Sequence, residues 1–247
     1  MDILYTVGEN SGHDNMELRW SLRSLAKYAK NLGKIIVAGY PPFWLSDDII
    51  RFPAPRALED KHKFPHILRQ VLYVARSGLI NGDFLLSSDD HFLSKEFDLE
   101  KTPFYKKQDH IQKFEDLDSN ADSFKKYVSI TGDILRKHGY SDVLCNFHKN
   151  TRLNSSVADE VKALVDSEKT NPYNEYGYES TILFQNVYAK HHEVCFQESK
   201  DWKIDKYNQE AIDSGAFSIS DKAFKDKEFL DYMTKEFGQP CIFEKYY

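Results

Sequence analysis

The sequence is poor in cysteine and lacks a long apolar run, and both absences limit what the protein can be. Its 247 residues include three cysteines, Cys145, Cys195 and Cys241, which are far apart and odd in number. We expect free thiols in a reducing compartment, because this pattern fits neither a disulfide framework nor a zinc site. There is no stretch of about 18 apolar residues. The opening MDILYTVGEN lacks a basic segment followed by a long apolar one. A cytoplasmic protein without a membrane span is therefore expected.

Two further features are missing, a glycine-rich phosphate loop and an excess of positive charge. Without a loop of P-loop or dinucleotide type, a nucleotide-binding fold of those kinds is disfavoured. The chain has 33 Lys and Arg against 39 Asp and Glu, a net charge of −6. Binding to a polyanion along the whole surface is not expected, although a local basic groove stays open. Its candidate residues are Lys106, Lys107, Lys125 and Lys126.

What the sequence does contain is a regular series of α/β units. Residues 2–8, DILYTVG, form an apolar run that ends in glycine, and residues 34–40, KIIVAGY, form a second run. Between them a helix is predicted from about Asp14, which can cap it, to Gly33. Its apolar residues recur at helical spacing: Leu18, Leu22, Leu25 and Ala29. This order predicts two parallel strands joined by a right-handed crossover.

The series continues as far as an acidic pair. A short strand is expected at 48–55, then a helix at 61–78, then the apolar strand 84–88. Beyond residue 95 the pattern weakens, and 145–154 is either a strand or a loop. Later elements are expected as helices at 122–140, 155–168, 180–192 and 221–237, and as strands at 216–220 and 241–247. With 41% hydrophobic residues, the chain suits one α/β domain, 1–247, with a Rossmann-like, mostly parallel sheet and a helical or irregular C-terminal part.

Asp89 and Asp90 are the strongest functional signal. Two carboxylates at the end of a buried strand repel each other and resist desolvation unless a cation or several donors neutralise them. Mg²⁺ and Mn²⁺ take carboxylate oxygens and often bridge to phosphate. Ligands of open α/β sheets collect beyond the carboxyl ends of the strands, so the pair predicts a metal–diphosphate site. The alternative is structural, because aspartates also form turns and cap helices.

A family resemblance rests on four segments in this order: DILYTVG, ELRWSLRSLAKY, KIIVAGYPPFWL and FLLSSDDHFL. Together they resemble the core of the GT-A glycosyltransferases, in particular the branch of Stealth-type capsular sugar-phosphate transferases and small phage-encoded transferases. The resemblance covers residues 1–95; later similarity is confined to FHKNTRLN, YESTILFQN and AFSISD. It implies a GT-A fold with a nucleotide-sugar-binding half, 1–95, and an acceptor-side half, 96–247. It also implies a nucleotide-sugar donor and a divalent cation, Mn²⁺ or Mg²⁺.

The resemblance carries roles for individual residues. Asp89 and Asp90 take the place of the metal-binding Asp-x-Asp motif, and Asp90 can also serve the acceptor as a catalytic group. Ser88 occupies the first slot of that motif, so the sequence leaves open whether both carboxylates bind the metal directly. The positions that match nucleotide-contacting ones are Val7, Gly8, Glu9 and Arg19.

A histidine and two glutamates are candidates for a further metal ligand and for the catalytic carboxylate. His148 is a candidate third metal ligand, and the alternative is a satisfied histidine in a strand or loop. Glu179, with Glu175 behind it, is the candidate catalytic carboxylate beside the acceptor. The alternative for Glu179 is an acidic residue in the first turn of a helix, where the dipole favours anions. His191 and His192 end a helix and are more typical of C-terminal cations than of a site.

Several cations can meet substrate. Lys63, with Lys61 and Arg69, can contact the diphosphate or remain solvated on a helix. The segment of Tyr105, Lys106 and Lys107 can border the acceptor. That acceptor is expected to be either a polysaccharide or a hydroxymethylated base of phage DNA. Two other functions stay open, a sugar-phosphate transferase of Stealth type and a non-catalytic nucleotide-sugar-binding protein.

Overall fold

A five-stranded central sheet organises the protein. The computed structural model describes residues 1–8, 15–53, 63–111, 123–145, 148–168 and 178–245. The strand order is β4–β3–β1–β5–β9, with the first four parallel and β9 antiparallel to β5. The strands are β1 (Asp2–Val7), β3 (Ile35–Gly39), β4 (Ile50–Pro53), β5 (Asp83–Ser87) and β9 (Thr151–Asn154). The expected α/β class with a mostly parallel, Rossmann-like sheet is confirmed.

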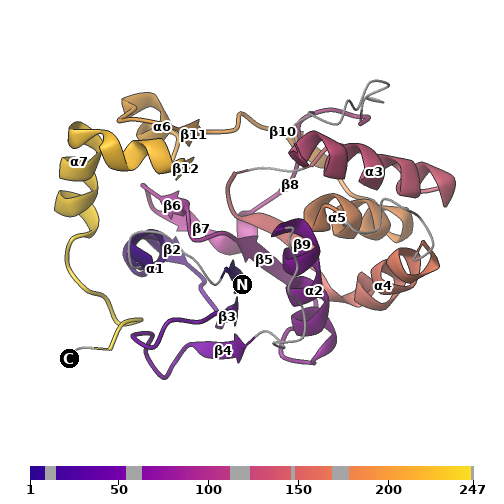
Figure 1. Ribbon diagram of the computed structural model, residues 1–247, viewed down its shortest axis with the longest axis horizontal. Helices are drawn as coiled ribbons and strands as arrows, with labels where there is room; N and C mark the ends of the chain where they lie inside the picture. The colour runs from indigo at the N-terminus through magenta and orange to yellow at the C-terminus, as the bar shows by residue number, and fades with distance from the viewer. Residues whose placement is uncertain (9–14, 54–62, 112–122, 146–147, 169–177, 246–247) are drawn as a thin grey trace.

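Helices cover both faces of this sheet (Figure 1). They are α1 (Met16–Tyr28) on one face and α2 (Lys63–Arg76), α3 (Ser123–Lys137), α4 (Ala158–Ser167) and α5 (Ser180–His191) on the other. Alternation along β1 explains why both faces are buried: Ile3 and Tyr5 pack toward α1, and Leu4 packs toward α2. Each such side chain contributes roughly 1.5–3 kcal/mol on full burial.

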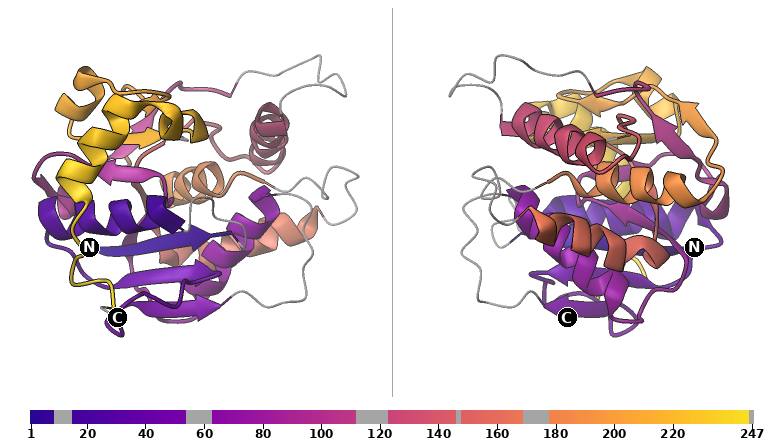
Figure 2. Two further views of the ribbon diagram at one scale, coloured as in Figure 1. Left: turned by 60° about the vertical axis from the view of Figure 1, so that its left-hand side comes forward. Right: turned by 90° about the vertical axis from the view of Figure 1, so that its right-hand side faces the viewer.

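A second, smaller layer lies over the outer side of α1 (Figure 2). It holds a three-stranded sheet of order β11–β12–β6 and the helices next to these strands in the chain. Its elements are β6 (His91–Leu93), β11 (Lys203–Ile204), β12 (Ala216–Ile219), α6 (Gln209–Asp213), η5 (Asp221–Lys225) and α7 (Lys227–Phe237). Trp20 of α1 packs against Phe229 of α7 at 6.4 Å between ring centroids, edge to face, and this contact joins the layers.

The remaining short elements lie between the longer ones along the chain. They are β2 (Ala29–Lys30), β7 (Phe97–Asp98), η2 (Leu99–Lys101), β8 (Phe104–Lys106), η3 (Ser155–Val157) and β10 (Phe196–Glu198). None of the helices in the described ranges combines the length and apolar character that a membrane span needs. The three cysteines are free, as expected.

Two expected elements differ from the sequence prediction: one helix has different ends, and one strand is not formed. Helix α1 begins after Asn15, which has a left-handed φ of 57° and makes no side-chain cap, while Asp14 lies outside the described residues. The helix stops at Tyr28 and not near Gly33, because the chain turns to extended conformation at Ala29. The expected C-terminal strand is wrong: the described residues there form a turn and a single bridge between Leu45 and Glu244.

Candidate functional site

A cavity lies where the course of the chain changes direction in the central sheet. From β1 the chain builds outward through β3 to β4, and then crosses to β5 on the other side of β1. Such a switch point leaves a crevice at the carboxyl ends of the two neighbouring strands, where α/β proteins bind ligands. A cavity of about 530 Å³, called the first cavity here, occupies this position. It brings together Val7, Gly8, Asp89 and Asp90, four of the residues expected from the sequence.

Residues outside the first 95 also line the first cavity. These are Lys203 and the segment Ile219–Asp221, which come from the second layer. Within the first 95 residues, α2 adds Gln70 and His66 to the lining. Both expected halves of the chain therefore contribute to this cavity, as they do to the central sheet through β9. Gln70 could have been identified from the sequence as a candidate site residue, because it is a polar residue on the otherwise apolar face of α2. Lys203 could not have been identified from the sequence, because the pairing of β11 with β12 is what places it beside the first cavity.

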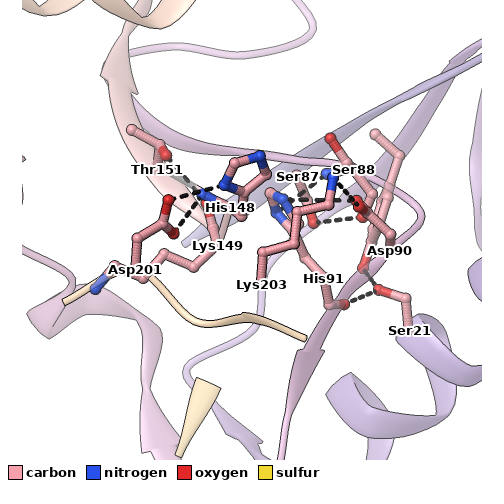
Figure 3. Close-up of polar contacts among 11 residues, drawn as sticks. Ser21, Ser87, Ser88, Asp90, His91, His148, Lys149, Thr151, Asp201 and Lys203 are labelled. Atoms are coloured by element: carbon pink, nitrogen blue, oxygen red, sulfur yellow. Dashed lines mark hydrogen bonds and ion pairs between the residues drawn. The ribbon is translucent and has the colours of Figure 1, made fainter. Parts of the chain in front are cut away.

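The acidic pair forms the centre of a tight turn. The His91 N–H donates to the Ser88 carbonyl at 3.2 Å, so Asp89 and Asp90 are the two central residues. The Ser88 N–H also donates to Nδ1 of His91 at 3.3 Å. From α1, Ser21 Oγ donates to the His91 carbonyl at 2.5 Å (Figure 3). Helix α1 thereby fixes the strand that follows the acidic turn.

Charge around Asp90 is partly balanced by the second layer. Its carboxylate lies 3.9 Å from Nζ of Lys203 and 3.7 Å from Nε2 of His91. Burial lowers the pKa of His91 to about 4, although the charge of Asp90 acts in the opposite direction. His91 is therefore neutral at pH 7, and Lys203 is the cation that faces Asp90.

The donor set of the first cavity fits a hard divalent cation only in part. Asp89 and Asp90 offer two adjacent carboxylates at its wall. Within the described ranges, no three or more His, Cys, Asp or Glu side chains converge as a metal-binding group. Mg²⁺ commonly binds through one or two carboxylates and takes its other oxygens from substrate phosphate and water. The two aspartates suit that mode and do not suit a site built from protein ligands alone.

His148 makes a different contact from the expected one. Nδ1 of its ring lies 2.8 Å from Oδ2 of Asp201 (Figure 3). The backbone N–H of His148 donates to Oδ1 of Asp201 at 2.9 Å. Lys107 donates to the same carboxylate at 2.6 Å. Burial acts to raise the pKa of Asp201, but the bonds from His148 and Lys107 outweigh it and hold this pKa well below its usual range. The structure thus places His148 in an ionic cluster and not in a metal group with Asp89 and Asp90.

Gln70 is the feature of the first cavity that most directly indicates a ligand. Its side chain is only 4% exposed. Neither its amide nitrogen nor its amide oxygen has a hydrogen-bond partner in the part of the chain that the structure describes. A buried polar group without a partner costs about 1–3 kcal/mol. A ligand edge that offers a donor beside an acceptor, as nucleobases do, would satisfy both atoms.

Arg19 and Glu179 lie away from the first cavity. Arg19 donates to Glu244 at 2.6 Å and its guanidinium covers the ring of Trp44 at 4.1 Å, so it holds the C-terminal segment. Glu179 is the N-cap of α5, where its carboxylate accepts from the Ile182 N–H at 2.7 Å. It is 4% exposed and does not line the first cavity. It thus lies one position before the first turn, where the structural alternative placed it, and it caps the helix with a side-chain hydrogen bond.

The remaining candidates divide into two groups. Glu9, Lys61 and Glu175 lie outside the described residues, as does the side chain of Lys63, whose backbone begins α2. Arg69 does not line the first cavity. The candidate basic groove is partly neutralised, because Lys106 lies 2.5 Å from Asp109 and Lys107 is bound to Asp201.

The two helix-terminal histidines make local contacts. His191 lies 2.7 Å from Glu160, and the ring of His192 stacks on Tyr188 with 4.2 Å between centroids. Neither residue lines the first cavity. Comparison with the models of known protein families gives no match, and comparison with curated proteins gives none either.

Proposed function

We propose that the protein is a metal-dependent glycosyltransferase of GT-A type that moves a sugar from a nucleotide sugar to an acceptor. The observation that supports this best is the turn of Asp89 and Asp90 at the wall of a cavity at the switch point of the sheet. Oxygen-rich sites of this kind suit a hard cation with phosphate. The resemblance of residues 1–95 to GT-A enzymes supports the same reading.

The first cavity would hold the donor with its diphosphate toward the acidic turn. Asp89 and Asp90 would hold the cation, which supplies neutralisation of the charge that develops on the departing diphosphate. Lys203 adds a positive charge at the same wall. The nucleobase would lie toward Gln70, whose amide offers it a donor and an acceptor.

The transfer step follows from these placements. The acceptor hydroxyl oxygen forms a bond to the anomeric carbon, and the bond from that carbon to the diphosphate breaks. The electron pair leaves with the nucleoside diphosphate, and the hydroxyl proton passes to a base, for which Asp90 is the candidate. Glu179 is a weaker candidate, since its carboxylate caps α5.

Identifying the released nucleotide tests this proposal. The protein is incubated with UDP-, GDP-, CDP- and dTDP-sugars, Mn²⁺ and candidate acceptors, and the products are separated by chromatography. Release of a nucleoside diphosphate supports glycosyl transfer. Release of a nucleoside monophosphate shows transfer of a sugar phosphate, as in the Stealth branch. Donor binding without nucleotide release in the presence of any acceptor shows a binding protein. This result and release of a monophosphate each overturn the proposal.

Variants connect the result to the site. Asp90→Asn is expected to abolish release, and Asp159→Asn is the matched control because Asp159 lies on α4 with its side chain 83% exposed. The two acceptor classes separate in a gel shift with hydroxymethylated duplex DNA at increasing salt. Binding that weakens steeply with salt indicates DNA, and its absence favours a glycan.

A further inference from the structure

A second cavity of about 370 Å³ borders the first one. The three-stranded sheet places them side by side. In β6 and β12, His91 pairs with Ser218 and Leu93 with Ala216, so the His91 end of the sheet lies beside Asp90 and Ile219 of the first cavity. His91, Leu93 and Ala216 line the second cavity.

Two buried polar atoms in the second cavity have no hydrogen-bond partner among the described residues. Thr102 is 2% exposed, and its hydroxyl has no hydrogen-bond partner within the described ranges. The same holds for the buried amide oxygen of Asn150. Both residues line the cavity. The amide oxygen needs a donor and the hydroxyl can accept or donate, so a ligand that carries hydroxyl groups would satisfy both.

The cavity is also locally basic in an acidic protein. Among the described residues that line it are three lysines, Lys95, Lys149 and Lys200, and one acidic residue, Glu96. Two of the ammonium groups lie over aromatic rings of the same wall. Lys149 lies 3.6 Å from the centroid of Tyr105, and Lys200 lies 3.6 Å from that of Trp202. These contacts hold cations where a ligand would meet them.

The acidic partners that the described residues offer to Lys95 and Lys200 are exposed. Lys200 lies 3.2 Å from Glu210 and Lys95 lies 3.7 Å from Asp213, and all four side chains are more than half exposed. Exposed ion pairs of this type contribute about 0–1 kcal/mol, so an entering anion can compete with them. The polar atoms inside the cavity suit a ligand with hydroxyl groups, and the lysines around them suit a negative charge. Together they suit a small polyhydroxylated anion.

We propose that the second cavity binds a sugar phosphate, through Thr102 and Asn150 to its hydroxyls and through Lys149 and Lys200 to its phosphate. On the proposed function, on which this part of the inference rests, this ligand is the acceptor or its terminal unit. A cavity of this size is at the small end of ligand sites and suits one sugar unit. DNA is the less favoured occupant, because the neighbouring Lys106 and Lys107 are bound to carboxylates.

Binding to the second cavity is measured without nucleotide or metal. Hexose 1-phosphates and hexose 6-phosphates are titrated into the intact protein by calorimetry, and each neutral hexose serves as the matched ligand. At least one sugar phosphate is expected to bind, and its neutral hexose at least about tenfold more weakly. Failure of every sugar phosphate to bind, or equal binding of the neutral sugar, would overturn the proposal. The proposal would also be overturned if wild type bound duplex DNA but no sugar phosphate, and if Lys149→Met abolished that DNA binding.

Two variants with matched controls locate the binding. Thr102→Val replaces a hydroxyl that has no partner among the described residues with a methyl group. Ser218→Ala is its control, because the Ser218 hydroxyl is equally buried, also has no partner among the described residues, and lies outside both cavities. Lys149→Met removes a cavity ammonium, and Lys162→Met removes one on α4 that pairs with Asp166. The cavity variants are expected to weaken sugar phosphate binding by roughly tenfold, with the controls unchanged. Unchanged affinity in both cavity variants contradicts the site.

The outcome is separable from that of the proposed function. If sugar phosphate binds and no nucleotide sugar does, the second cavity stands and the glycosyltransferase proposal fails. If nucleotide sugars are turned over and no sugar phosphate binds, only the second cavity is misassigned. Thermal unfolding of each variant shows whether a loss of binding reflects a loss of folded protein.

Discussion

Asp90 and His91 lie 3.7 Å apart through Oδ1 and Nε2, yet they line different cavities. The wall between a donor in the first cavity and a ligand in the second would thus be two adjacent side chains. Because β6 begins at His91 and α1 holds its backbone through Ser21, this wall has a fixed position.

Replacing Lys203 by Met is expected to weaken nucleotide-sugar binding by roughly tenfold while leaving the metal requirement in place. The reason is that Lys203 adds positive charge beside Asp90 but is not itself a metal ligand. Calorimetry with and without Mn²⁺ measures both effects. Lys222→Met is the control, since Lys222 is 76% exposed and pairs with Asp205. Equal affinities for the two variants would remove Lys203 from the site.

Replacing Gln70 by Leu is expected to separate stability from binding. The buried amide has no partner among the described residues, so its removal should leave the free energy of unfolding unchanged or raise it. Donor affinity should fall by roughly tenfold, because the nucleobase loses its two hydrogen-bond partners. Urea unfolding and donor titration check the two parts. A less stable protein with normal donor affinity would show that Gln70 is structural.

Replacing Glu179 by Ala is expected to reduce stability by about 1 kcal/mol, the usual cost of losing a helix N-cap. The carboxylate accepts from the Ile182 N–H and lines neither cavity, so the rate of nucleotide release should change less than threefold. A loss of turnover of a hundredfold or more in a folded variant would restore Glu179 as the catalytic carboxylate.

Glu244 makes stability depend on pH. Burial acts to raise its pKa, but hydrogen bonds and charge from Arg23 and Arg19 outweigh this and lower it below its usual 4.5. A depressed carboxylate pKa stabilises the fold above the unfolded pKa, and this contribution is lost as pH falls through the folded value. Glu244→Gln should therefore be less stable than wild type at pH 7, by about 3 kcal/mol for a broken buried pair. The difference should shrink below about pH 4.5. Urea unfolding across this range tests it, and a constant difference would contradict the assignment.

The sequence predicted those parts of the protein that depend on local pattern. The stripe with Leu18 and Leu22 gave α1, and the order of strands and helices placed Asp89 and Asp90 at the carboxyl end of a central strand beside Val7 and Gly8. These predictions hold because buried faces impose their periods over short distances.

What the sequence could not give depends on contacts between distant segments. Strand β6 has three residues, and its pairing with β12 has no local signal, so the approach of Lys203 to Asp90 was missed. Arg19 could bind phosphate, but its guanidinium forms a salt bridge with the buried Glu244. No local sequence pattern shows that the C-terminal segment packs against α1. Glu179 was correctly expected to open a helix, and its capping bond decides its placement.

The central claim is that Asp89 and Asp90 hold a divalent cation against the diphosphate of a nucleotide sugar. Its most direct test is calorimetric titration of UDP-, GDP-, CDP- and dTDP-sugars into wild type and Asp90→Asn, each with and without Mn²⁺. The account predicts that one donor binds wild type only when Mn²⁺ is present and does not bind a folded Asp90→Asn variant. Donor binding of equal strength without the metal, or in Asp90→Asn, would contradict it.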